Sequence, residues 1–171
     1  MANSRNKFDT KDSLELGEHA ENLFIVLAVR SGWKVSASSK DENIEDHWDY
    51  LIEKAGEVFK VEVKSQKRIR RGDKTEQADF TWVELRNVRG KVGWLFGKAD
   101  LIAFEKETSF LFVKRLDLLA VINKKVNLVA KVRTPTDAVY KIYIREGRKD
   151  KITLLPTRDI EEIKFTEWKK A

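Results

Sequence analysis

Two alternating runs joined by a short turn make up residues 47–64, which read HWDYLIEKAGEVFKVEVK. Residues 47–53 and 58–64 each place apolar side chains at every second position, which is the period of a half-buried strand. The residues between them, 54–57, include Gly56 and suit a tight connection. We therefore predict a β-hairpin over this stretch.

The polar positions of this hairpin include two acids and a lysine. Alternation puts Glu62 and Lys64 on one face of the second strand, opposite Val61 and Val63. Asp49 lies in the first strand, where it can meet Glu62 on that face. Adjacent carboxylates repel unless a cation joins them, and hard oxygen ligands favour Mg²⁺ or Mn²⁺. We expect a metal site here, with Lys64 stabilising charge that develops beside it.

A helix over residues 13–31 precedes the hairpin. Apolar side chains recur at spacings of three and four from Leu16 to Leu27, Ser13 is a suitable N-cap, and Gly32 a suitable stop. Glu21 adjoins the apolar face and could deliver a third carboxylate to the metal site. Glu18, one turn earlier, is the alternative to Glu21.

The remaining pattern predicts an α/β fold in one domain over residues 1–171, with a mixed central β-sheet flanked by helices. Further strands are expected at 33–38, 80–88, 99–105, 110–114, 139–145 and 151–155. Helices are expected at 116–126 and, as a short terminal helix, at the start marked by Pro156 and Asp159. Residues 1–11 are polar and expected to be poorly ordered.

Composition narrows the class of protein. The chain has no cysteine, which excludes disulfides and thiolate chemistry, and no apolar run near the ~20 residues of a membrane span. We expect a protein of the cytoplasm, or of the host cytoplasm if it is viral. The net charge is +6, and residues 64–71 carry Lys64, Lys67, Arg68, Arg70 and Arg71, which favours a polyanionic partner.

Residues 17–64 resemble the core of the PD-(D/E)XK nuclease superfamily. The resemblance rests on Gly17-Glu18-His19-Ala20-Glu21, on His47-Trp48-Asp49 and on Val61-Glu62-Val63-Lys64-Ser65. The helix ending in Gly32-Trp33-Lys34-Val35 is similar to the opening of archaeal Holliday-junction resolvases. The second half, with Trp82-Val83-Glu84-Leu85 and Gly93-Trp94-Leu95-Phe96-Gly97-Lys98-Ala99-Asp100, is similar to small phage-type members. The family's proline is replaced by Trp48.

This resemblance implies a restriction-endonuclease-like core and metal-dependent hydrolysis of phosphodiester bonds, with DNA as the first choice of substrate. It implies that Asp49 and Glu62 hold the metal and that Glu21 and Lys64 assist them. Gln66 and the basic run Lys67, Arg68, Arg70 and Arg71 are then expected to contact the nucleic-acid backbone.

Other readings stay open. A branched-DNA resolvase would need two active sites and hence a homodimer; an RNA endonuclease and a non-catalytic nucleic-acid-binding module are further alternatives. His19 is expected to be exposed, whereas His47 could approach the metal. Asp100 is expected to cap a turn, and Trp94 is the tryptophan most suited to touching a substrate.

Overall fold

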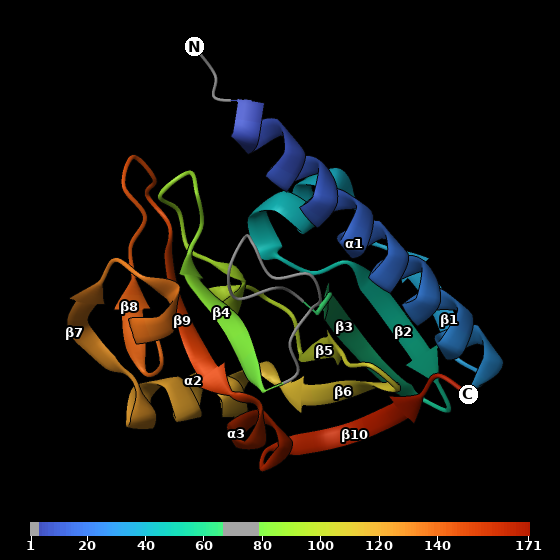
Figure 1. Cartoon of the computed structure of the whole chain (residues 1–171). Coiled ribbons are helices and arrows are strands. Elements are labelled where there is room, and N and C mark those ends of the chain that lie inside the picture. Colours follow the sequence, from blue (N-terminus) through green and yellow to red (C-terminus); the bar gives the residue numbers. More distant parts are fainter. Residues whose placement is uncertain (1–3, 67–78) are drawn as a thin grey trace.

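The computed structural model describes residues 4–66 and 79–171, with side chains from residue 14 onward. Helix α1 (Ser4–Arg30) lies across a six-stranded sheet, and a four-stranded sheet stands beside it (Figure 1). Helices α2 (Arg115–Lys125) and α3 (Thr157–Glu161) lie at the opposite end from the start of α1. The predicted α/β class, with a mixed sheet flanked by helices, is confirmed.

Helix α1 begins nine residues before the expected N-cap at Ser13. No glycine or proline interrupts residues 4–16, so the backbone continues as a helix beyond the apolar stripe. The predicted stop is confirmed: Gly32 has φ +86°, and the Trp33 amide donates to the Ala28 carbonyl at 2.9 Å. This left-handed ending turns the chain back toward the first strand.

The six-stranded sheet has the order β1-β2-β3-β5-β6-β10. Its strands are β1 (Lys34–Ala37), β2 (Tyr50–Lys54), β3 (Glu57–Lys64), β5 (Leu101–Glu105), β6 (Ser109–Lys114) and β10 (Lys164–Lys169). Strands β3 and β5 run parallel, and the other neighbours run antiparallel. The predicted hairpin is β2–β3, turned by Ala55 and Gly56, which both have positive φ.

The four-stranded sheet has the order β4-β9-β8-β7 and was not predicted as a separate unit. Its strands are β4 (Phe80–Arg86), β9 (Lys151–Pro156), β8 (Lys141–Tyr143) and β7 (Asn127–Val132). Short helical turns connect the elements: η1 (Glu42–Asp46), η2 (Trp94–Phe96) and η3 (Pro135–Asp137). Strands β7 and β10 had no counterpart in the sequence prediction.

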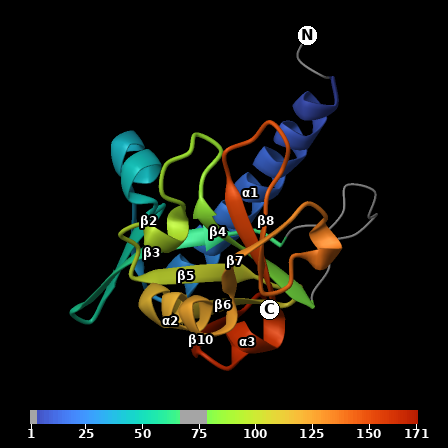
Figure 2. The same cartoon turned by 90° about the vertical axis from the view of Figure 1, so that its left-hand side faces the viewer.

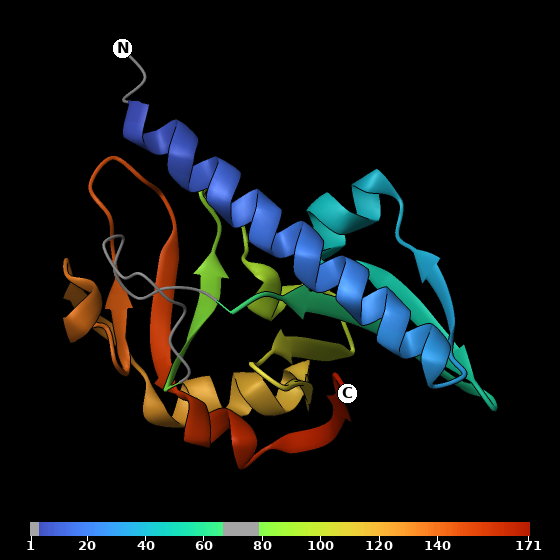
Figure 3. The ribbon, with the colours of Figure 1, turned by 45° about the vertical axis from the view of Figure 1, so that its right-hand side comes forward.

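Two groups of buried side chains hold these layers together. The helix-side core packs α1 against one face of the six-stranded sheet, where Phe24 contacts strand residues such as Phe110 and Phe112. Figure 3 shows α1 running across this sheet, with β1 and β2 beside its C-terminal half. The shared core lies on the other face and joins both sheets, through side chains that include Trp48, Val83, Trp94, Ile102, Leu111, Leu118 and Leu155.

Within the described part of the chain, no helix is long and apolar enough to cross a membrane.

Candidate active site

Strand β3 presents Glu62 and Lys64 on the face opposite the helix. Val61 and Val63 belong to the helix-side core, so the intervening side chains turn toward the shared core, as alternation predicts. Glu62 is only 6% exposed and forms an ion pair with Lys64. A buried carboxylate is thus held at the end of β3 by its own strand neighbour.

Asp49 lies just before β2, rather than inside a strand as predicted. Its backbone amide donates to the Val61 carbonyl at 2.8 Å, which carries the pairing with β3 one residue beyond the strand. Its Oδ2 accepts a hydrogen bond from the Val63 amide at 2.7 Å, and its Oδ1 accepts one from Asn43 Nδ2 at 2.7 Å. These bonds fix the Asp49 carboxylate beside the strand that carries Glu62.

The electrostatics of the site reflect two acids brought together. Burial, and secondarily the charge of Glu62, raise the pKa of Asp49 to about 6. Burial alone would lower the pKa of Lys64, but Glu62 and Asp49 together raise it, so the lysine stays protonated. The centre therefore combines a protonated lysine with two neighbouring acids, and the pKa of Asp49 lies above its usual range.

Helix α1 contributes Glu21 to the edge of this centre. The Tyr50 hydroxyl donates to Glu21 Oε2 at 3.1 Å, which ties the helix to the first residue of β2. Burial and the nearby charge of Asp49 raise the pKa of Glu21. Glu18 is exposed one turn away, so the geometry favours Glu21 over Glu18.

Glu84 of β4 is a fourth acid near the centre, and the sequence did not single it out for this place. Its charge is among those that raise the pKa of Lys64. Gly93 packs on its backbone so closely that an added Cβ would lie 2.5 Å from the Glu84 carbonyl oxygen. Strand alternation could place Glu84 on a face of β4, but nothing local indicates that its charge acts on Lys64 of β3.

The remaining candidate residues separate into different surroundings. His19 is exposed, as predicted. His47 is not on a strand face: it ends η1 with φ +56°, and its Nε2 lies 3.0 Å from the Val92 carbonyl oxygen. The Asp100 side chain bonds to β3 instead of to the local turn predicted for it, because its Oδ2 accepts a hydrogen bond from the Lys60 amide at 2.8 Å.

Trp94 is 5% exposed and packs edge-on against Phe104, so the prediction of a substrate contact is wrong. Its ring instead forms a floor beneath the lysine of the centre, with Lys64 Nζ at 5.5 Å from the ring centroid. Trp48 has the same relation to Lys60 at 5.3 Å. Both tryptophans therefore support charged side chains from within the shared core.

Of the residues predicted to contact nucleic acid, the structure describes Gln66. Gln66 is half-buried two residues after Lys64. Lys67, Arg68, Arg70 and Arg71 lie outside the described residues, so their predicted role stays a prediction.

The carboxylates of Asp49, Glu62 and Glu21 suit a hard divalent cation only as an open site, in which the protein supplies part of the ligand shell. Over residues 14–66 and 79–171, whose side chains the structure describes, no three His, Asp or Glu side chains converge as a metal cage. Asp49 and Glu62, however, are mutually repelling and partly desolvated, and Mg²⁺ commonly takes one or two carboxylates with water and substrate phosphate completing its shell. The pair suits such an open site, with Glu21 at its margin.

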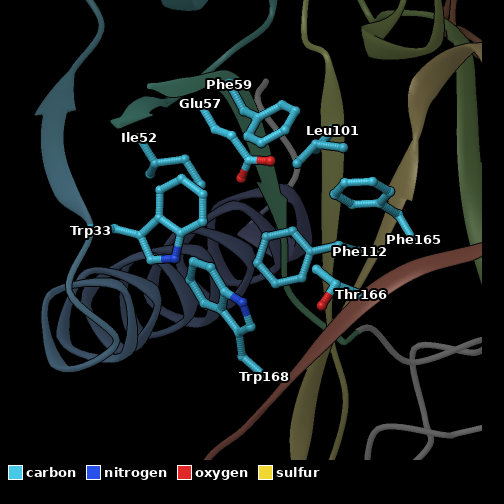
Figure 4. Close-up of a pocket in the computed structure, with 9 residues that line it drawn as sticks. All are labelled: Trp33, Ile52, Glu57, Phe59, Leu101, Phe112, Phe165, Thr166 and Trp168. Carbon is cyan, nitrogen blue, oxygen red and sulfur yellow. The ribbon is translucent and has the colours of Figure 1, made fainter. Parts of the chain in front are cut away.

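A cavity of about 290 Å³ lies away from these acids (Figure 4). It occupies the other end of β3 and the helix-side face of the sheet, where Phe59 and Leu101 line it with Trp33, Phe112, Phe165 and Trp168. Glu57 brings a carboxylate to its wall, as the close-up shows. The cavity is aromatic and separate from the candidate active site.

Comparison with known proteins gives little beyond this geometry. No family model matches the chain, and no curated protein matches it. Among solved structures, the chain is similar to a bacterial homing endonuclease, I-Ssp6803I, at 20% sequence identity and a TM-score of 0.41. That match covers 60% of this chain and 69% of the endonuclease.

Proposed function

We propose that the protein is a divalent-metal-dependent nuclease that hydrolyses phosphodiester bonds of DNA. The observation that carries this proposal is the coupling of Asp49 and Glu62 beside Lys64. Two desolvated acids and a lysine at one strand end are costly for folding alone, and perturbed groups of this kind are typical of reaction centres. The resemblance of residues 17–64 to PD-(D/E)XK nucleases assigns the same residues.

Asp49 and Glu62 would hold Mg²⁺ or Mn²⁺. When bound, such an ion neutralises charge on the phosphate and lowers the pKa of a water. Asp49 is oriented for this task by Val63 and Asn43, which hold its two oxygens in place. Glu62 is oriented by its ion pair with Lys64.

Lys64 supplies the positive charge that the chain itself brings to the reaction. Its ammonium stays protonated, so it can donate to a phosphate oxygen and stabilise charge that builds up there in the transition state. Glu21 accepts from Tyr50 through one oxygen, and its other oxygen can accept a proton or a hydrogen bond from the attacking water.

The test is incubation with Mn²⁺ and a panel of supercoiled, linear, single-stranded and four-way-junction DNA, together with RNA. We expect the wild-type protein to cleave DNA, and Asp49→Ala and Lys64→Ala each to lower the rate by about 10²–10³-fold. Circular dichroism establishes that both variants stay folded.

Glu18→Gln is the matched control, since it removes an exposed acid one turn from Glu21 and should leave the rate unchanged. Glu21→Gln should lower the rate. Undiminished cleavage by both the Asp49 and the Lys64 variants would overturn the proposal. Cleavage of RNA but not DNA would show that the protein is an RNA endonuclease. Binding of nucleic acid without any product would show that it is a non-catalytic nucleic-acid-binding module.

A further inference from the structure

Two loops lie side by side at one end of the strands of the four-stranded sheet (Figure 1). One joins β4 to η2 through residues 87–93, and the other joins β8 to β9 through residues 144–150. Both extend in the same direction, toward the end of the molecule where α1 begins (Figures 1 and 2). We call these two loops, together with the strand residues Arg86 and Lys151 that flank them, the paired loops (residues 86–93 and 144–151).

The first of the paired loops is a turn held in shape by hydrogen bonds of Asn87. Asn87 Oδ1 accepts hydrogen bonds from the amides of Arg89 and Lys91, each at 3.0 Å. The Asn87 amide donates to the Lys91 carbonyl at 2.8 Å, and Gly90 has φ +81°. These bonds hold Arg89 at the tip of a defined hairpin.

The second loop packs on the first through Gly90. A Cβ on Gly90 would lie 3.1 Å from Lys149 Cδ, so the glycine leaves room for the lysine stem. The tips that carry Arg89 and Lys149 are therefore neighbours, and their charges act on one surface.

The charge of the paired loops is strongly positive. They contain seven basic residues (Arg86, Arg89, Lys91, Arg145, Arg148, Lys149 and Lys151) and two acids (Glu146 and Asp150). Arg145 is paired with Asp150, and Lys91 lies 3.7 Å from Glu45, with both side chains well exposed. Among the described residues, Arg86, Arg89, Arg148 and Lys149 have no ion-pair partner.

The base of the paired loops is bonded to the segment that carries the active-site aspartate. His47 Nε2 lies 3.0 Å from the Val92 carbonyl oxygen, and Asp49 follows His47 by two residues. Glu84, whose charge reaches Lys64, precedes Arg86 by two residues on β4. A polyanion bound to the loops would thus border the centre.

We propose that the paired loops bind the phosphate backbone of duplex DNA. This inference rests on the proposed nuclease function and adds a second contact surface, distinct from residues 66–71. Basic side chains that have no ion-pair partner among the described residues, such as Arg89 on its hydrogen-bonded turn, can contact phosphate oxygens. Neither loop contains an aromatic residue, whereas binding of single strands depends on aromatic stacking. The loops therefore fit a duplex, whose bases are already stacked.

The test measures duplex-DNA affinity as a function of salt, without divalent metal so that the DNA stays intact. Each lost phosphate contact should lower the slope of log K against log[salt] by about 0.9. We expect Arg89→Ala/Arg148→Ala to lower the slope by nearly 2 and to weaken binding about tenfold or more, equally for unrelated sequences.

Lys124→Ala/Lys164→Ala is the matched control. It removes the same charge from α2 and β10, at the far end of the molecule, and should bind as the wild type does (Figure 1). An unchanged slope and affinity in the loop variant would overturn the inference, as would an equal loss for single-stranded DNA.

The outcome separates this inference from the proposed function. If the wild type binds duplex and the loop variant does not, the inference holds even where no cleavage is found. If the wild type cleaves and the loop variant binds equally well, the nuclease stands and the loops are not its contact.

Discussion

At the scale of single residues, Asp49 combines two conflicting properties. Both of its oxygens accept hydrogen bonds at 2.7 Å, which stabilises the charged form. Burial and Glu62 act more strongly in the opposite direction and raise its pKa to about 6. The Asp49 carboxylate is therefore held in a fixed orientation, while its negative charge is poorly stabilised by the protein. This combination suits the metal-binding role proposed for it.

The first prediction concerns the pH dependence of cleavage. Asp49 must be ionised to bind a metal, so the single-turnover rate should rise about tenfold per unit below about pH 6 and level off above it. The measurement is the rate at fixed subsaturating Mn²⁺ between pH 5 and 8. Raising Mn²⁺ should move the rise to lower pH, because metal competes with the proton; a midpoint insensitive to Mn²⁺ would contradict the assignment.

The second prediction concerns stability at the same residue. The folded pKa of Asp49 (about 6) exceeds its ordinary value of 3.8, so its ionisation opposes folding. The contribution is favourable below about pH 4 and is lost as pH rises through about 6. Asp49→Asn should therefore be more stable than the wild type by about 1–3 kcal/mol at pH 8, and similar to it at pH 4.

Urea unfolding at both pH values measures this difference. Mg²⁺ should stabilise the wild type and not the variant, since only the carboxylate pair binds it. A variant that is less stable than the wild type at pH 8 would show that Asp49 serves the fold.

At the scale of elements, η1 and η2 pack closely because Gly97, at the end of η2, has no side chain. A Cβ on Gly97 would lie 2.7 Å from the Asp46 carbonyl oxygen and 2.7 Å from His47 Cβ. The Lys98 amide also donates to that carbonyl at 2.7 Å. Gly97 thus lets η2 press against the residues that lead into Asp49.

The third prediction compares two glycines. Gly97→Ala should destabilise the protein by about 1–3 kcal/mol and lower cleavage, because the clash is with backbone that positions Asp49. Gly17→Ala in α1, where a Cβ meets nothing within 4 Å, should raise stability by about 0.5–1 kcal/mol. Thermal unfolding checks both, and equal effects would contradict the proposed packing.

Local pattern predicted the elements that build most of the site. The period of two placed Glu62 and Lys64 on one face, and the Gly56 turn brought Asp49 beside them. Helical spacing favoured Glu21 over Glu18. These inferences needed only neighbours within a hairpin or along a helix.

Contacts between distant segments could not be predicted in this way. Pairing of β4 with β9 joins residues about seventy positions apart, and the charge of Glu84 on β4 acts on Lys64 from the other sheet. Strand β10 was not predicted, because its partner β6 lies far from it in the sequence. His47 was assigned to a strand because nothing local marks the left-handed residue that ends η1.

At the scale of the whole molecule, the candidate centre lies where the two sheets share a core. Lys64 rests on Trp94, and Trp94 packs with side chains from both sheets. The paired loops join strands of the four-stranded sheet, whereas Glu62 and Lys64 lie in the six-stranded sheet and Asp49 immediately precedes its strand β2. Movement of one sheet against the other would therefore change both the centre and its bordering surface.

The parallel pairing of β3 with β5 has a consequence for the order in which the molecule is made. The chain leaves β3 at Lys64, passes through β4, and returns to pair at Leu101. Strand β4 acquires its own neighbour only when residues 151–156 have been synthesised. A chain that still lacks β9 cannot pair β4, so the four-stranded sheet, with the Glu84 whose charge reaches Lys64, is completed only after residues 151–156 have been made.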